Sequence, residues 1–283
     1  MSHPSSSFDW DDLTFHEHSE RLDDNQRWST WDSIERLCRG PEPWPDWLVT
    51  RAAIDSDLGV LKTGKEADVS LLERTSLDDP GESCLLAAKR YRATSHRLFR
   101  RDDGYTEGRR IRNSRDTRAM ARGSGHGRAV EAGLWATAEW EALKRLFLAG
   151  VPVPYPVQVD GSEILMEYIA DGEAAAPRLH QTRPSPAELD ALFEQLRGAL
   201  CTMAGLGLVH GDLSPYNTLA TGVGSGFPRL VVIDVPQLTD LYANPNAESF
   251  LHRDCANMAA WFTARGHTID AEDLFAEVIS QAW

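Results

Sequence analysis

Three side chains in the second half of the chain have the types and the spacing of a site for phosphoryl chemistry. Asp212 and Asn217 stand five residues apart in one polar segment, and Asp234 follows the apolar run at 230–233. Magnesium prefers hard oxygen ligands such as these, and phosphoryl transfer needs positioning and charge neutralisation more than covalent help. We therefore predict that Asp212 and Asp234 are catalytic and that Asn217 and Asp234 bind the metal.

The spacing around Asp212 supports this prediction. His210-x-Asp212, with Asn217 five residues after the Asp, has the spacing of a protein-kinase catalytic loop. In that loop the Asp accepts the proton of the attacking hydroxyl and the Asn holds magnesium. Each residue alone is common in loops, but the three together, after a predicted helix and around a predicted strand, favour phosphoryl transfer. The expected cofactors are ATP and Mg2+, or Mn2+ in its place.

A second stretch, His252-Arg253-Asp254, looks like the His-Arg-Asp that begins a protein-kinase catalytic loop. Ala259 stands five residues after Asp254, where the pattern needs Asn, and no Asp at the end of a strand follows. We expect Arg253 and Asp254 to be helix residues that brace their part of the fold.

A site of this kind also needs a cation. Lys89 lies late in a predicted strand at 84–91, and Glu139 lies on the next predicted helix, where it can pair with Lys89. The 29 basic Lys and Arg residues include only four Lys, so an ammonium group at this position is notable. We predict that both residues belong to the ATP site.

Residues 62–67 are predicted to form a turn between two strands that lies over the phosphates. A match to a Walker phosphate-binding loop, from Gly59 to Lys65, fails at Glu66, where Ser or Thr is required, and a strand follows rather than a helix. The candidate ATP contacts in the turn are Thr63, Gly64, Lys65 and Glu66. The candidate contacts for the adenine base, in a hinge after a later strand, are Met166, Glu167, Tyr168 and Ile169.

The elements that position these residues indicate a two-lobed plan. Strands are predicted at 69–73 and 84–91, a helix at 133–148, a hairpin at 157–159 and 164–169, a helix opened by a capping box at Ser185, a strand at 230–233, and helices at 249–264 and 270–282. Strands with one helix, followed mainly by helices, indicate an α+β fold.

Three regions follow from this order. Residues 1–50 form an acidic leader that contains Trp and is expected to be partly disordered or docked, with a short helix near 31–38. Residues 51–168 form the N-lobe and residues 169–283 the C-lobe.

An arginine-rich segment at 95–130 interrupts the N-lobe. It has ten Arg, no Lys and four acidic residues, a local charge of +6 on a chain of net charge −14. Without an apolar face we expect it to be mobile in the absence of a partner, and its guanidinium groups are candidate contacts for RNA phosphates.

The composition is that of an ordinary globular protein. Hydrophobic residues make up 42% and charged residues 25% of 283 residues, and no apolar run approaches the about 18 residues of a membrane span. The polar, acidic start has no signal-peptide pattern, so a cytoplasmic location and no membrane partner are expected. The four Cys are far apart and are expected to be free thiols.

Taken together, these motifs resemble the RIO family of atypical serine/threonine protein kinases, closest to its type-one branch. The pieces that carry the resemblance are Thr63-Gly-Lys-Glu-Ala67, Ala88-Lys-Arg-Tyr91, Trp135 with Ala138-Glu139, Gly150-Val-Pro-Val-Pro154, Leu165-Met-Glu-Tyr-Ile169, Leu208 to Leu219, Val232-Ile-Asp-Val-Pro-Gln237 and Ala247 to Asp254. Two departures from the family patterns matter: Asp234 is followed by Val-Pro-Gln, closer to the type-two branch, and the N-terminal winged helix of the type-two branch has no counterpart in the leader.

The resemblance implies a trimmed protein-kinase-like fold without an activation loop, which agrees with the 49 residues that remain after Asp234. It implies a non-specific serine/threonine protein kinase whose protein substrate is unknown, or an ATPase in which Asp234 itself takes the phosphoryl group. It also implies autophosphorylation, for which Ser114 and Ser124 are candidates because each lies near arginines.

Two alternatives stay open at this point. Small-molecule phosphotransferases of the aminoglycoside or choline type also carry His-Gly-Asp-Leu and Ile-Asp, but they build their acceptor pocket from a larger helical lobe. The chain could also be a nucleotide-dependent switch that binds RNA or a ribosomal particle through the segment 95–130.

Overall fold

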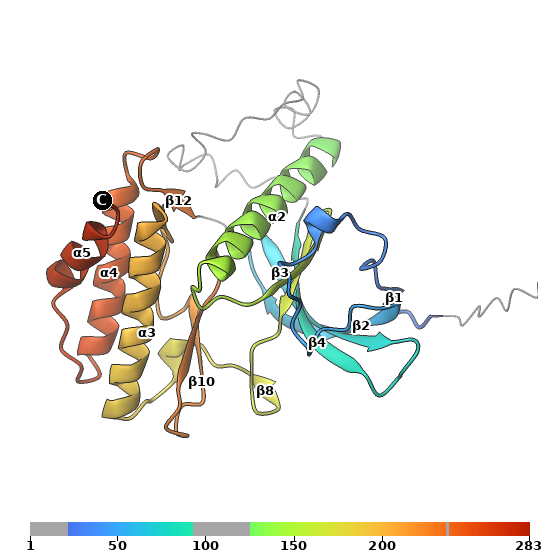
Figure 1. Ribbon diagram of the computed structural model, residues 1–283, viewed down its shortest axis with the longest axis horizontal. Helices are drawn as coiled ribbons and strands as arrows, with labels where there is room; N and C mark the ends of the chain where they lie inside the picture. The colour runs from blue at the N-terminus through green and yellow to red at the C-terminus, as the bar shows by residue number, and fades with distance from the viewer. Residues whose placement is uncertain (1–21, 93–124, 236–237) are drawn as a thin grey trace, which may run out of the picture.

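The computed structural model describes residues 22–92, 125–235 and 238–283. A strand-rich part and a helical part lie side by side, and helix α2 (Gly125–Leu148) runs between them (Figure 1). The arrangement is the two-lobed α+β plan predicted from the order of elements. The leader up to residue 21 and most of the arginine-rich segment, with Ser114 and Ser124, lie outside the described residues.

The N-lobe is an antiparallel sheet in the order β1-β2-β3-β4-β6-β5. Its strands are β1 (Gln26–Trp28), β2 (Ala53–Thr63), β3 (Ala67–Ser76), β4 (Ser83–Tyr91), β5 (Pro156–Asp160) and β6 (Glu163–Glu167). Side chains alternate between the two faces of β4: Leu86 and Ala88 pack in a cluster with the leader, whereas Ala87, Lys89 and Tyr91 line a cavity on the other face. This alternation places Lys89 in the site.

The described part of the leader is docked on the sheet. β1 pairs with β2, and Trp31, Leu48 and Val49 are buried against Leu86 and other residues of the sheet. The short helix expected near 31–38 is replaced by a single 3-10 turn, η2 (Arg36–Cys38). The leader therefore supplies part of the apolar core of the N-lobe.

Helix α2 begins eight residues before its expected start at residue 133 and includes residues 125–130 of the predicted loop. Of residues 129–132, ahead of the expected start, only Ala132 is buried, and the large buried residues Trp140, Leu143 and Leu146 come later in the helix. The larger apolar residues alone marked the later start. The helix packs on β4, β5 and β6, so it can bring a side chain up to Lys89.

The C-lobe is built on three helices. They are α3 (Pro186–Gly205), α4 (Ala247–Thr263) and α5 (Ala271–Ser280), with the short strands β7 (Ala170–Asp171), β8 (Ala174–Ala175), β9 (Leu208–Val209), β10 (Thr218–Thr221), β11 (Arg229–Val232) and β12 (Thr239–Asp240) and the 3-10 turn η5 (Leu179–Gln181) between them. The predicted capping box opens α3: Ser185 accepts from the backbone of Glu188, and the Glu188 carboxylate accepts from the backbone of Ser185. No helix in the described part of the chain combines the length and the apolar composition needed to cross a bilayer.

The hairpin of β10 and β11 brings two predicted metal ligands together. Asn217 directly precedes β10 and Asp234 comes two residues after β11, while Thr218 pairs with Val232 at the end of the ladder. The backbone N–H of Ile233 donates to the carbonyl of Asn217 at 3.0 Å, which extends the pairing towards both residues. Only twelve residues separate Asp234 from the start of α4, so no long loop follows this strand.

Candidate active site

A cavity of about 500 Å3 lies between the two lobes, within the usual range of small-molecule sites. Ten of the predicted site residues line it: Gly64, Glu66, Lys89, Glu139, Met166, Glu167, Tyr168, Ile169, Asp212 and Asp234. Three others, Thr63, Lys65 and Asn217, are not among its lining residues. Residues from both lobes thus meet in one place.

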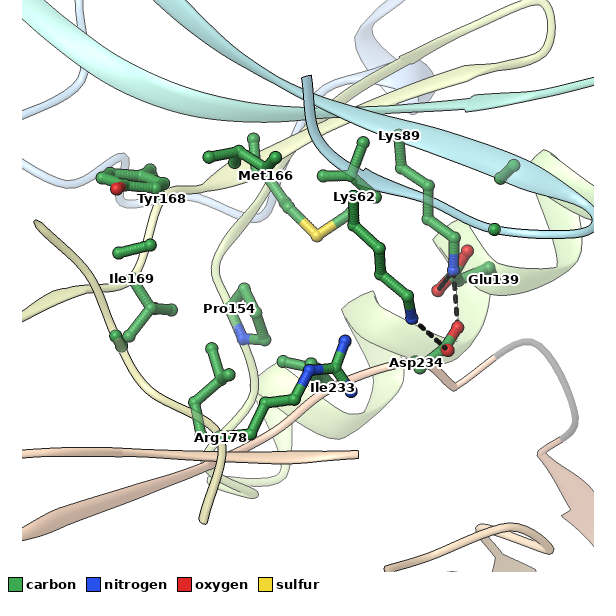
Figure 2. Close-up of a pocket in the computed structure, with 18 of the residues that line it drawn as sticks. Lys62, Lys89, Glu139, Pro154, Met166, Tyr168, Ile169, Arg178, Ile233 and Asp234 are labelled. Carbon is green, nitrogen blue, oxygen red and sulfur yellow. Dashed lines mark hydrogen bonds and ion pairs between the residues drawn. The ribbon is translucent and has the colours of Figure 1, made fainter. Parts of the chain in front are cut away.

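Lys89 joins three elements of the cavity. Its ammonium donates to Glu139 Oε1 on α2 at 2.7 Å and to Asp234 Oδ1 after β11 at 2.8 Å (Figure 2). Burial opposes the charge of Lys89, but the two carboxylates outweigh it and raise the pKa of its ammonium. Tyr91 also donates its hydroxyl to Glu139. The lysine is therefore held as a cation at the junction of the lobes.

Asp234 has an unusual backbone. Its φ is 65°, and it is the single non-glycine residue with positive φ in the described part of the chain. Asp tolerates this left-handed region better than most residues, and such conformations concentrate at functional sites. Burial would raise the pKa of its carboxyl, but the charge and hydrogen bond of Lys89 and the charge of Lys62 lower it. Asp234 is therefore an ionised carboxylate directed into the cavity.

Asp212 and Asn217 lie in the loop between β9 and β10, where Asp212 lines the cavity and Asn217 is bonded to it. The amide nitrogen of Asn217 donates to the backbone carbonyl of Asp212 at 2.9 Å and to its Oδ2 at 3.0 Å. These bonds orient the Asp212 carboxylate. They use the amide nitrogen of Asn217, so its amide oxygen is the atom that can coordinate a cation.

His210 connects the loop that contains Asp212 with the end of the strand that precedes Asp234. Its Nε2 lies 3.2 Å from the carbonyl of Ile233, and its Nδ1 lies 3.3 Å from the backbone nitrogen of Asp212. Burial lowers the pKa of this imidazole, and the neutral ring has the one donor and one acceptor that these contacts need. His210 thus ties the loop of Asp212 to the strand that ends at Asp234.

Comparison with known proteins agrees with this geometry. The RIO domain family model matches residues 81–274, more than half of the chain. The chain belongs to the RIO domain family. It is 35% identical over 228 residues to the RIO-type serine/threonine-protein kinase Rio1 of Haloferax volcanii, covering 81% of this chain and 70% of that one. It is 32% identical over 230 residues to the serine/threonine-protein kinase RIO1 of Chaetomium thermophilum, covering 77% of this chain but 41% of that one.

Solved structures show the same fold. The Rio2 kinase of Chaetomium thermophilum, in its complex with ADP, Mg2+ and phosphoaspartate, aligns with a TM-score of 0.53 and 22% identity, covering 79% of this chain and 62% of that one. A second structure of that kinase aligns with a TM-score of 0.51, covering 80% and 67%. The predictions of a RIO-type serine/threonine kinase and of a trimmed two-lobed kinase fold are confirmed, and the comparisons do not favour a small-molecule phosphotransferase.

In this RIO domain, Asp254 holds the loop around Asp212. Its Oδ2 accepts from the backbone N–H of Gly211 at 2.8 Å and its Oδ1 from that of Leu213 at 2.9 Å. Arg253 donates to the carbonyl of Gly211. Burial raises the pKa of the Asp254 carboxyl to about 7 although the two amides oppose it. The expected bracing role is therefore directed at the peptide groups on both sides of Asp212.

Sequence reasoning missed two charged residues of the cavity. Lys62 lies at the end of β2, with Nζ 3.8 Å from Asp234 Oδ2, and Arg178 extends into the same pocket from the segment before η5 (Figure 2). The guanidinium of Arg178 donates to the carbonyl of Tyr216 in the loop after Asp212. Lys62 falls in the stretch 62–67 that was predicted as a turn over the phosphates, but it lies in β2 (Ala53–Thr63), and its side chain was not predicted to reach Asp234. Arg178 has no local motif, so only the spatial arrangement reveals it.

The part of the cavity near the hinge of this RIO domain is apolar. Met166 and Glu167 end β6, and the chain then passes through Tyr168 and Ile169 into the C-lobe. The apolar residues that line the cavity include Ala87, Pro154, Met166, Ile169, Leu219 and Ile233. An apolar slot of this kind suits a heteroaromatic ring.

Proposed function

We propose that this RIO kinase transfers the γ-phosphoryl group of ATP to serine or threonine of a protein, with the roles given below. The observation that carries the proposal is the position of Lys89, bonded to both Glu139 and Asp234 in the cavity that Asp212 also lines. Phosphoryl transfer depends on such fixed charges around the transferred group, and little covalent chemistry is required of the protein.

The apolar slot would hold adenine, with the backbone of residues 166–169 as the candidate partner of the base. The phosphates would then lie beneath the turn of residues 63–66. This turn is tight: the N–H of Gly64 donates to the carbonyl of Ala67 at 2.9 Å, and a Cβ at Gly64 would lie 2.9 Å from that oxygen. Glycine at this position therefore supports a close cover over a ligand.

Asn217 and Asp234 would hold Mg2+, which neutralises the negative charge of the phosphates when it is bound. The described residues contain no cluster of three or more His, Cys, Asp or Glu that could hold a metal by itself. Mg2+ commonly binds through one or two carboxylates together with substrate phosphates, and this donor set fits that mode. Mn2+, which also accepts carboxylate and carbonyl oxygens, stays an alternative.

Asp212 would accept the proton of the attacking hydroxyl as its oxygen bonds to the γ-phosphorus and ADP leaves. The orientation of its carboxylate by Asn217 supports this role. To test it, the wild type and Asp212→Asn are incubated with labelled ATP, Mg2+ and cell lysate. We expect labelled acceptor proteins with the wild type alone, and full labelling by folded Asp212→Asn would rule out Asp212 as the base.

Asp234 is also a candidate phosphoryl acceptor. The related Rio2 kinase is described as a phosphoaspartate complex, and Asp234 carries an ionised carboxylate at the cavity. A carboxylate oxygen would bond to the γ-phosphorus while ADP leaves, and water would later hydrolyse the acyl phosphate. Rapid-quench labelling should give an adduct that is labile to hydroxylamine and absent in Asp234→Asn. If all label survives hydroxylamine, Asp234 is only a metal ligand.

The segment 95–130 would contact RNA or a ribosomal particle. Its local charge of +6 on an acidic chain supports this role. Deletion of residues 95–122 should weaken RNA binding and reduce its dependence on salt. Equal binding at every salt concentration by the deletion variant would exclude this contact.

A further inference from the structure

Lys62 and Lys89 stand in one row across the sheet. Val69 in β3 is the register partner of Lys62 in β2 and also of Lys89 in β4. Directly opposite residues of neighbouring strands share a face, so both lysines lie on the cavity side. Two of the four lysines of the chain are thereby directed at one carboxylate.

An irregularity in β2 makes this possible for Lys62. Successive residues of a strand normally point to opposite faces, yet Leu61 and Lys62 both line the cavity. The register between β2 and β3 shifts between Val60 and Lys62. A bulge of this kind re-aims a side chain, and bulges are common next to active sites.

The two lysines hold Asp234 differently. Lys89 is buried, lies 2.8 Å from Oδ1 and is also bonded to Glu139, so its position is fixed from two sides. The side chain of Lys62 is 46% exposed, and its Nζ is 3.8 Å from Oδ2, longer than a hydrogen bond. An exposed pair of this kind is weak, and a lysine on a flexible stem can exchange one anionic partner for another.

We infer that Lys62 is a second phosphate-binding lysine that contacts the terminal phosphoryl group and makes the site prefer a nucleoside triphosphate to a diphosphate. The inference rests on the proposed function, because it takes Asp234 to lie beside the group that is transferred. Lys89 is already neutralised by two carboxylates, whereas Lys62 can leave Asp234 and turn to a phosphate at the mouth of the cavity. Lys62 lies next to the covering turn of residues 63–66, beneath which the phosphates would lie.

The test is equilibrium binding to the full chain, measured by calorimetry with Mg2+ and either ADP or the non-hydrolysable β,γ-imido analogue of ATP. Lys62→Met removes the charge and keeps the length of the side chain, and Lys62→Arg keeps the charge. Lys144→Met is the matched control, because Lys144 lies on α2 outside the cavity and pairs with Glu141 at 3.3 Å. Circular dichroism checks that each variant is folded.

We expect Lys62→Met to weaken binding of the triphosphate analogue by about tenfold or more, since a charge-assisted bond is lost. Binding of ADP should change by less than about twofold, as for an exposed ion pair. Lys62→Arg should retain most of the preference, and Lys144→Met should leave both affinities unchanged. Equal losses for both nucleotides, or no loss for either, would overturn the inference while leaving the kinase function standing. A wild type that binds neither nucleotide would refute the proposed function itself.

Discussion

The two walls of the cavity are built in different ways. The N-lobe wall presents its cations from strands, and the register of β2, β3 and β4 places Lys62 and Lys89 in one row. The C-lobe wall presents Asp212 from a loop, in which Asn217 is bonded to the Asp212 carboxylate. Backbone pairing between strands, including the bulge in β2, positions the first wall, whereas buried polar side chains from distant elements position the second.

This difference predicts different responses to substitution. A strand keeps its backbone bonds when one side chain changes, so the N-lobe wall should lose charge but keep its shape. The loop of the C-lobe wall depends on Asp254 from α4, on His210 and on Thr218 for its course. A change at these supports should alter the geometry of the site and the stability of the fold together.

The largest effect is expected at Asp212 itself. Asp212→Asn keeps a side-chain oxygen that can accept from Asn217 but removes the base, so turnover should fall by about a thousandfold. Nucleotide affinity, measured by calorimetry, should stay near that of the wild type because the cations of the other wall are unchanged. A large loss of affinity would mean that Asp212 mainly shapes the site.

A large effect on stability is expected at Lys89. Lys89→Met removes the cation that Glu139 and Asp234 share, and the Glu139 carboxylate is buried. The free energy of unfolding should therefore fall by about 3 kcal/mol. Urea denaturation measures this change. The double variant Lys89→Met with Glu139→Gln should recover part of the loss, because one unpaired charge is removed. A single variant as stable as the wild type would show that the pair contributes little.

At the C-lobe wall, Asp254→Asn should lower the free energy of unfolding by about 2 kcal/mol at pH 5, because the carboxamide turns its NH2 group to one of the two backbone N–H groups of Gly211 and Leu213, whereas both oxygens of the protonated carboxyl can accept. The folded pKa of Asp254, about 7, is raised above its ordinary 3.8, so its protonated form is favoured by folding. The stability that this group contributes is therefore fully present below pH about 4 and is lost as pH rises through 7.

The measurement that isolates this titration is the difference in free energy of unfolding between the wild type and Asp254→Asn across the pH range. We expect the difference to shrink from pH 5 to pH 8, since Asn does not titrate. A difference that stays constant with pH would mean that Asp254 is already ionised at pH 5.

The smallest effect is expected at Thr218, which is fully buried and donates its hydroxyl to the carbonyl of Ser214 at 2.9 Å. Thr218→Val should cost about 1 kcal/mol of stability, because the carbonyl of Ser214 then keeps only its bond from the backbone N–H of Asn217. Thr202→Val is the matched control, since Thr202 makes a bond of the same length to Gly198 on the exposed side of α3. Equal effects of the two variants would show that the loop gains nothing special from the buried bond.

Local patterns in the sequence were enough to predict most elements. The capping box at Ser185 marked the start of α3, and the apolar runs at 84–91 and 230–233 marked β4 and β11 to within a residue. These signals are readable because caps and strands depend on residues that are near in the chain. The start of α2 was missed because, of residues 129–132, only Ala132 is buried, so no large buried residue marks this part of the helix.

For the site, the sequence by itself determined which residues carry the chemistry: the spacing from Asp212 to Asn217, the strand before Asp234, and the order of Lys89 and Glu139 are all one-dimensional features. Only the tertiary structure decided that Lys62 joins them and that Asp254 supports Asp212. The bulge that aims Lys62 depends on how β2 pairs with β3, and Asp254 meets the backbone around Asp212 from more than forty residues away. Such contacts arise from packing between distant segments, for which a single sequence holds no local signal.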